Sequence, residues 1–253
     1  MSHDSLIERK SILIFCNSCA RFRKINKSAD LREGCLCPTC GLNSRQRGIL
    51  LAIQIIILKR IFHCRELKVV GVSDGEPLRK SLSKIFKDRY KNYEYHEEPR
   101  LDITKVDNKL VISADIVICS EVLEHVPPPI DLAFEGLFSI IKLGGFAVIS
   151  VPHMLTGQSH VEHYPILSNF EIQNSQDPKL IGFDQEGIYL EFTDLVFHGG
   201  AGSTLEYRVF SKDSLIENLT RVGFTQIKSL PNRRFFGVSW EPWSRVWIAR
   251  KPY

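Results

Sequence analysis

The sequence contains no apolar run that approaches the roughly 20 residues of a membrane-spanning helix. Its nearest candidate, residues 49–58, is about half that length and includes Gln54. The first residues also lack the basic end, the apolar middle and the small-residue cleavage site of a signal peptide. These two absences predict a cytoplasmic protein without a membrane span.

The sequence also lacks a large excess of either positive or negative charge. The chain has 33 lysines and arginines against 29 acidic residues, a formal net charge of +4. This balance gives no support to a strong binder of polyanions, and it leaves a local basic patch open. The length of 253 residues and the apolar fraction of 43% suit one large domain, or one domain with a small appendage. No pattern indicates an oligomeric state.

Cysteine, in contrast, is concentrated near the start of the chain. Cys16 and Cys19 form one C-x2-C pair, and Cys37 and Cys40 form a second pair 17 residues later. This spacing is typical of structural zinc sites, where four thiolates complete a tetrahedron and leave no open catalytic position. Cys35 is a fifth thiol that could replace a ligand or stay free. We predict a structural Zn²⁺ on the four paired cysteines; a reduced, metal-free loop is the alternative.

A small N-terminal module follows from this cluster. Residues 1–48 are too few to bury a core without a metal, and they include the start of a helix that links them to a main domain over residues 49–253. Asn43 and Gln46 are spaced to cap this helix. Arg45 and Arg47 lie in its first turn, where cations oppose the helix dipole. They belong either to a solvated face or to a ligand contact.

Residues 114–152 have the pattern of half an open α/β sheet. The continuous apolar run at residues 116–118 predicts a parallel strand that is covered on both faces. A helix is expected after the prolines at 127–129, because apolar residues then recur at helical spacing. Paired glycines end it, and residues 146–151 form the next buried strand.

This segment resembles the class I S-adenosylmethionine-dependent methyltransferases. In that family a strand ending near Ser120 and Glu121 leads into Leu-Glu-His (123–125), then a helix, then Leu-Gly-Gly and a strand ending at Pro152. The resemblance covers residues from about 67 to the C-terminus, and fits a bacterial subgroup with N-terminal cysteine knuckles. It implies an α/β fold: a Rossmann-like open sheet of seven strands, mostly parallel with one antiparallel strand, preceded by the zinc-knuckle module. It also implies S-adenosylmethionine as cofactor.

A first cofactor contact is implied at the turn of residues 71–75, between a strand over 67–72 and a helix opening at Glu76. The family usually has Gly-x-Gly-x-Gly there, and this chain replaces the second glycine with Ser73. The backbone donors of the turn and the helix N-terminus suit a carboxylate. The resemblance further implies a ribose contact from Glu97 or Glu98, after a short strand starting at residue 93, and an adenine contact from Asp102. The full implied cofactor set is Gly71, Ser73, Asp74, Glu97, Glu98, Asp102, Ser120 and Glu121.

A long insert, residues 152–210, follows the carboxyl end of the second strand of that segment. Loops of this length usually cover a site. His163 and His198 in the insert, with His125 beside the cofactor loop, are candidate bases, because an imidazole titrates near neutral pH. Each alone is more often an ordinary hydrogen-bonded histidine. His160 and His163 could also bind a metal, although no third ligand stands at an obvious spacing.

These patterns predict a methyltransferase that acts on a small-molecule or sugar acceptor, most simply at a hydroxyl. Two alternatives remain open. One is an RNA methyltransferase in which Arg45, Arg47, Lys59 and Arg60 contact phosphates. The other is a non-catalytic scaffold, suggested by Ser73 in the glycine turn.

Overall fold

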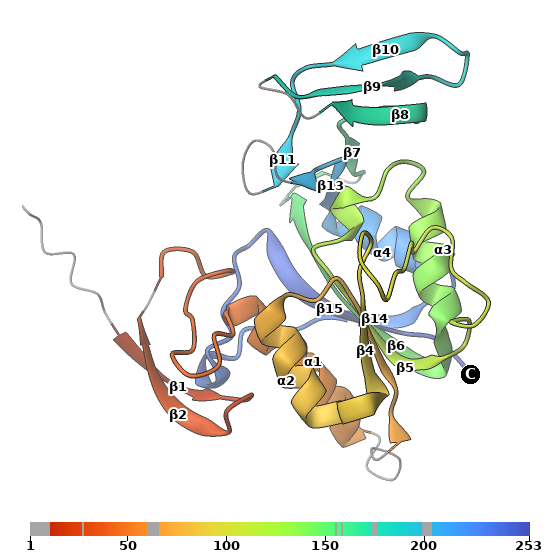
Figure 1. Ribbon diagram of the computed structural model, residues 1–253. Helices are drawn as coiled ribbons and strands as arrows, with labels where there is room; N and C mark the ends of the chain where they lie inside the picture. Colours follow the sequence, from red (N-terminus) through yellow and green to blue (C-terminus); the bar gives the residue numbers. More distant parts are fainter. Residues whose placement is uncertain are drawn as a thin grey trace, which may run out of the picture.

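The computed structural model describes residues 11–26, 28–59, 66–154, 156–157, 159–173, 177–198 and 204–253. Three parts are visible in Figure 1: an N-terminal hairpin module, a central sheet with helices, and an insert that extends away from the sheet. Residues 1–10 of the expected N-terminal module lie outside the described residues. No helix in the described ranges has the length and apolar character needed to cross a membrane.

The central sheet has the strand order β14-β15-β6-β5-β3-β4. Its strands are β3 (Val69–Val72), β4 (Tyr90–Tyr93), β5 (Ala114–Ser120), β6 (Ile141–Met154), β14 (Thr225–Ser229) and β15 (Ser244–Arg250). Strands β4, β3, β5 and β6 are parallel, and β15 is antiparallel to both its neighbours. Among these six strands, the expected mostly parallel arrangement with one antiparallel strand is therefore confirmed.

Two short strands raise the count of this sheet to eight rather than the expected seven. Strand β13 (Arg208–Ser211) pairs parallel with the end of β6, and β7 (Val161–Glu162) pairs antiparallel with β13. The prediction of a strand that starts at residue 93 is wrong, because β4 ends at Tyr93 and the chain then turns. That turn is closed by two backbone hydrogen bonds: Glu94 N–H donates to the Pro99 carbonyl, and Leu101 N–H donates to the Glu94 carbonyl.

Helices cover both faces of the sheet. Helices α1 (Ser44–Lys59) and α2 (Glu76–Phe86) pack on one face, and α3 (Asp131–Ile140) and α4 (Lys212–Arg221) pack on the other. The alternation along β5 explains this: Ile116 and Ile118 join the core under α1 and α2, whereas Val117 and Cys119 join the core under α3 and α4. A strand buried on both faces must be apolar throughout, as the sequence indicated.

The N-terminal module is a hairpin that packs on the main domain. Its strands β1 (Ser11–Cys16) and β2 (Arg21–Asn26) pair antiparallel, and the ring of Phe15 stacks 5.7 Å from Phe235. Phe235 belongs to the 3-10 helix η4 (Arg234–Phe236), just before β15. Helix α1 begins with the expected cap, in which Gln46 N–H donates to Asn43 Oδ1 (2.7 Å) and Asn43 N–H donates to Gln46 Oε1 (3.2 Å).

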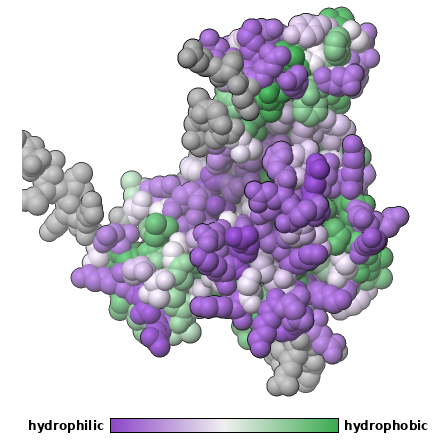
Figure 2. Space-filling view, viewed as in Figure 1, coloured by the Kyte–Doolittle hydropathy of each residue, from purple (hydrophilic) through white to green (hydrophobic). Residues whose placement is uncertain are grey.

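The insert has a small hydrophobic core of its own, apart from the two cores that cover the faces of the sheet. It contains β8 (Ser168–Gln173), β9 (Lys179–Phe183), β10 (Tyr189–Phe192), β11 (Phe197–His198) and β12 (Thr204–Leu205). Tyr164, Leu180, Leu205 and Tyr207 are buried together there. In Figure 2, hydrophobic residues gather over the insert and over the N-terminal module, while the face between them is largely hydrophilic.

Candidate cofactor and acceptor site

A cavity lies at the carboxyl-terminal ends of the parallel strands β3 and β5. We call this end of the sheet the carboxyl edge. The two strands are adjacent and parallel, so the residues that follow Val72 and Cys119 emerge side by side. The cavity has a volume of 190 Å³ and is lined by Arg45, Gln46, Ser73, Asp74, Gly75, Leu78, Ser120 and Glu121. Four residues of the implied cofactor set therefore line one space, together with two residues from the first turn of α1.

The turn after β3 needs a glycine at its start. A Cβ atom added to Gly71 would lie 2.7 Å from Asn92 Oδ1 and closer still to the Asp74 carboxylate. Ser73 has φ +55°, a left-handed conformation that glycine adopts without strain. Its N–H donates to the Tyr93 carbonyl at 2.8 Å. Ser73 therefore holds a backbone conformation that usually favours glycine.

Asp74 places a buried carboxylate in this turn. Its side chain is 4% exposed, Oδ2 accepts a hydrogen bond from the Tyr90 hydroxyl (2.7 Å), and Oδ1 has no hydrogen-bond partner among the described residues. Burial raises the pKa of Asp74 to about 7. A carboxylate in such surroundings suits a cationic group of a ligand.

The next acidic residue along the edge is Glu94, which no motif in the sequence singles out. Glu94 follows β4 directly, and its Oε1 accepts a hydrogen bond from Asn92 Nδ2 at 2.6 Å. Glu97 and Glu98, the two expected acids, are exposed and lie within the turn that follows the strand. Asp102 is partly buried between Leu101 and Ile103, and its Oδ1 accepts hydrogen bonds from Thr104 N–H (2.9 Å) and Oγ1 (2.7 Å).

Two arginines of the N-terminal module reach the carboxyl edge. Arg45 donates from Nη1 to Ser120 Oγ at 2.5 Å and also pairs with Glu33. Arg32 is buried, lies over the Trp243 ring at 5.2 Å, and forms an ion pair with Glu121. The module therefore supplies part of the wall of the cavity, a contact that spacing along the chain could not show.

Arg47 is neither solvated nor available to phosphates, which corrects both expectations for it. Its guanidinium is fully buried and donates to the carbonyls of Leu42 (2.5 Å), Phe236 (3.0 Å) and Gly237 (2.8 Å). It joins the second cysteine knuckle to the segment before β15. The side chain of Lys59 and all of Arg60, the other two residues of the RNA alternative, lie outside the described residues.

The four paired cysteines come together in the N-terminal module. Their sulfur atoms all lie within 4.8 Å of one another, with Cys16 Sγ 3.7 Å from Cys40 Sγ and Cys19 Sγ 3.9 Å from Cys37 Sγ. Four sulfurs around one zinc ion at about 2.3 Å would be about 3.8 Å apart, so the cluster fits a tetrahedral ion. Cys35 is buried but lies outside this group.

The three candidate histidines also converge, around the carboxylate of Glu206, which no motif in the sequence singles out. Glu206 lies with Oε1 3.3 Å from His163 Nε2 and with Oε2 3.6 Å from His198 Nδ1. The rings of His125 and His198 are 5.4 Å apart. Burial lowers the pKa of His125, which keeps its imidazole neutral near pH 7.

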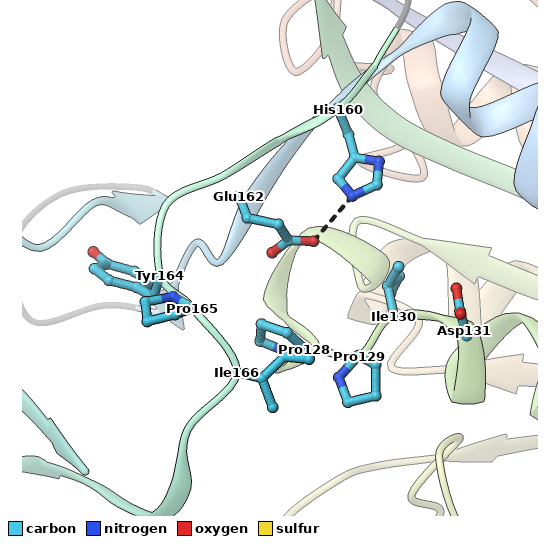
Figure 3. A pocket seen from close by; sticks show the side chains of 9 residues that line it. All are labelled: Pro128, Pro129, Ile130, Asp131, His160, Glu162, Tyr164, Pro165 and Ile166. Atoms are coloured by element: carbon cyan, nitrogen blue, oxygen red, sulfur yellow. Dashed lines mark ion pairs between the residues drawn. The ribbon is translucent and has the colours of Figure 1, made fainter. Parts of the chain in front are cut away.

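His160 points elsewhere. Its Nε2 lies 3.2 Å from Glu162 Oε1, beside a separate cavity of 290 Å³ between the insert and the start of α3 (Figure 3). His163 contacts Glu206 instead. The described residues therefore do not bring these two histidines together at one metal position.

Comparisons with known proteins agree with this architecture. No family model matches the sequence, and no curated protein matches it significantly. Among solved structures, the CMeT domain of the citrinin polyketide synthase is similar with a TM-score of 0.51 and 11% identity, over 86% of this chain and 54% of that chain. The chain has the fold of S-adenosylmethionine-dependent methyltransferases.

Two other structures resemble the chain more weakly. A Burkholderia thailandensis 1,6-didemethyltoxoflavin-N1-methyltransferase has a TM-score of 0.47 and 16% identity, over 82% of this chain and 80% of that chain. A Clostridium acetobutylicum S-adenosylmethionine-dependent methyltransferase has a TM-score of 0.45 and 11% identity, over 84% and 93%. At these identities the likeness concerns the fold.

Proposed function

We propose that this protein is an S-adenosylmethionine-dependent methyltransferase that methylates a hydroxyl of a small-molecule or sugar acceptor. One observation carries the proposal: the Gly71 turn, the buried Asp74 and the Ser120 loop enclose a single cavity at the carboxyl edge. Open α/β folds bind ligands at this edge, outside the carboxyl ends of adjacent strands.

The residues of the edge suit the parts of the cofactor. The Asp74 carboxylate suits the ammonium of the methionine part, and the N-terminus of α2 suits its carboxylate. Glu94, at the end of β4, is our proposed acceptor of the ribose hydroxyls, and Asp102 the proposed contact of the adenine amine. The enclosed 190 Å³ is smaller than the roughly 300–1,000 Å³ of typical ligand sites, so a bound cofactor would extend along the edge beyond it.

Methyl transfer mainly requires that the protein hold the acceptor oxygen in line with the methyl group and the sulfur of the cofactor. Bound S-adenosylmethionine would supply an electrophilic methyl group. An acceptor oxygen would form the C–O bond as the C–S bond breaks, and the electron pair of that bond would stay on the sulfur and neutralise it. Holding two reactants in line is worth up to roughly 7–11 kcal/mol. The hydroxyl proton passes to an imidazole of the group around Glu206, and we propose His163 for this role, which adds on the order of 10²–10⁴-fold.

We further propose that Cys16, Cys19, Cys37 and Cys40 hold a structural Zn²⁺. All four ligand positions would be filled by thiolates, so this ion has no open position for catalysis. Its contribution is positional, because the module it stabilises carries Arg32 and Arg45 to the carboxyl edge. A small hairpin of this kind has little core of its own and depends on the metal for folding.

The acceptor class can be tested with methyl-labelled S-adenosylmethionine. We expect label to appear in the small-molecule and glycan fractions of a cell extract, and to fall at least tenfold with His163→Asn. The control variant, His160→Asn, alters a histidine of the same insert that does not contact Glu206, and should keep full transfer. Label confined to the RNA fraction would overturn the proposed acceptor class, and no transfer to any fraction would favour the scaffold.

A further inference from the structure

A second group of metal-type ligands lies beside the insert, apart from the cysteines. Glu124 and His125 in the 3-10 helix η3 (Leu123–His125) and His198 in β11 each offer a ligand atom, and these atoms all lie within 4.8 Å of one another. The three residues come from two segments far apart in the sequence. Strand β12 (Thr204–Leu205) connects them: it pairs with β11, and Tyr207 N–H, just after it, donates to the Glu124 carbonyl at 2.8 Å.

Glu124 is the unusual member of the group. Its side chain is 1% exposed, and neither carboxylate oxygen has a hydrogen-bond partner among the described residues. The nearest ion-pair contact of the carboxylate is with His125 Nε2, at 3.9 Å from Oε1. A buried carboxylate without hydrogen bonds costs several kcal/mol unless a charge or a metal compensates it. Its burial therefore needs an explanation that the described side chains do not supply.

The histidines are oriented as metal ligands usually are. His125 Nδ1 lies 2.8 Å from the Leu205 carbonyl, which can only accept, so Nδ1 carries the hydrogen and Nε2 presents its lone pair toward Glu124. His198 Nδ1 lies 3.6 Å from Glu206 Oε2. Metal-binding histidines commonly hold their second nitrogen against a backbone carbonyl or a carboxylate in this way.

From this geometry we propose that Glu124, His125 and His198 bind one divalent first-row transition-metal ion such as Mn²⁺ or Co²⁺. Two imidazoles with one carboxylate favour these ions over Mg²⁺ and Ca²⁺, which prefer oxygen ligands throughout. Three protein ligands leave positions open for an acceptor oxygen, so the ion can polarise the hydroxyl that is methylated. Only this catalytic role rests on the proposed function; metal binding itself does not.

The test is a Mn²⁺ titration of the full-length, zinc-loaded protein, followed by electron paramagnetic resonance. Thiolates select Zn²⁺, so Mn²⁺ reports on the nitrogen–oxygen site. We expect one Mn²⁺ per chain, with affinity at least about 100-fold weaker in Glu124→Gln and His198→Asn. Glu206→Gln, which alters an orienting partner, should weaken binding roughly 10–100-fold. His160→Asn is the matched control and should bind as the wild type does.

Several outcomes would overturn the proposal. The first is that the folded wild type shows no saturable binding of Mn²⁺ or Co²⁺. The second is that a Glu124→Gln variant with a native circular dichroism spectrum binds the metal as tightly as the wild type does. Binding of S-adenosylmethionine is measured on the same sample. Cofactor binding without metal binding refutes only the metal site, whereas metal binding without cofactor binding refutes only the methyltransferase.

Discussion

Two buried carboxylates, Asp74 and Glu124, lie on loops at the same edge of the sheet. Burial raises the pKa of each to about 7, mainly because the ionised form loses its hydration. For such a group the folded state keeps its proton to a higher pH than the unfolded chain does. The free energy of unfolding therefore falls as pH rises from about 4 to about 7, and this loss is absent below that range.

Asp74→Asn should remove one part of this pH dependence, because the amide does not ionise. In that window the wild-type stability is expected to fall by as much as about 1.4 kcal/mol per pH unit for each such group. Urea unfolding at several pH values between 4 and 8 measures the slope. The exposed control, Glu97→Gln, should keep the wild-type slope, and an equally steep slope in Asp74→Asn would contradict the assignment.

Glu94→Gln tests the ribose contact. Loss of a charged hydrogen-bond acceptor costs about 1.5–3 kcal/mol, so affinity for S-adenosylhomocysteine should fall roughly 10–100-fold. Calorimetric titration measures it, with Glu97→Gln and Glu98→Gln as matched controls on the same loop. If either control weakens binding more than Glu94→Gln does, the ribose contact comes from Glu97 or Glu98, as the sequence predicted, and not from Glu94.

At the scale of elements, helix starts are set by local side chains. Ser211 caps α4 by accepting a hydrogen bond from Ser214 N–H at 2.9 Å, and Ser214 Oγ accepts one from Ser211 N–H at 3.0 Å. The buried position of this cap ties α4 to β13, and hence to the insert.

Ser211→Ala is expected to lower the free energy of unfolding by about 1 kcal/mol, because N–H groups of the first turn lose their acceptor. Thr220→Ala is the control: it removes an exposed hydroxyl from the same helix, and should change stability by less than about 0.5 kcal/mol. Thermal and urea unfolding measure both variants. Equal effects would mean that the cap is not what stabilises this helix start.

Local patterns also explain how much of the molecule the sequence could predict. The two-face burial of β5, the cap of α1 and the spacing of the cysteines depend on neighbouring residues, and the structure contains each of them. The end of β4 was misplaced, because the break after Tyr93 depends on a turn closed by backbone hydrogen bonds. Two contacts of the site could not be predicted, because they arise from packing between segments that are distant in the sequence. These are the contact of Arg32 with Glu121 and the contact of Glu206 with His163.

At the scale of the whole molecule, direct contacts join the N-terminal module to the proposed cofactor cavity. Arg45 contacts Ser120, Arg32 pairs with Glu121, and Arg47 joins the second knuckle to the segment before β15. Loss of the proposed zinc ion should therefore disturb cofactor binding, although no cysteine lines the cavity.

Cys37→Ser should release the zinc and weaken cofactor affinity at least tenfold, because the module no longer positions its arginines. A chromogenic chelator measures the zinc, and calorimetry measures the cofactor. The matched control is Cys35→Ser, a buried cysteine outside the four-sulfur group, which should retain one zinc per chain. Unchanged cofactor affinity in metal-free Cys37→Ser would show that the module and the cavity are independent.

The most direct measurement is a calorimetric titration of the zinc-loaded wild type and of Gly71→Ala with S-adenosylmethionine. We predict saturable binding of one cofactor per wild-type chain. Binding to Gly71→Ala should be at least tenfold weaker, because the added Cβ collides with the Asp74 and Asn92 side chains that shape the turn. A folded wild type that takes up no cofactor at millimolar concentration would contradict the account.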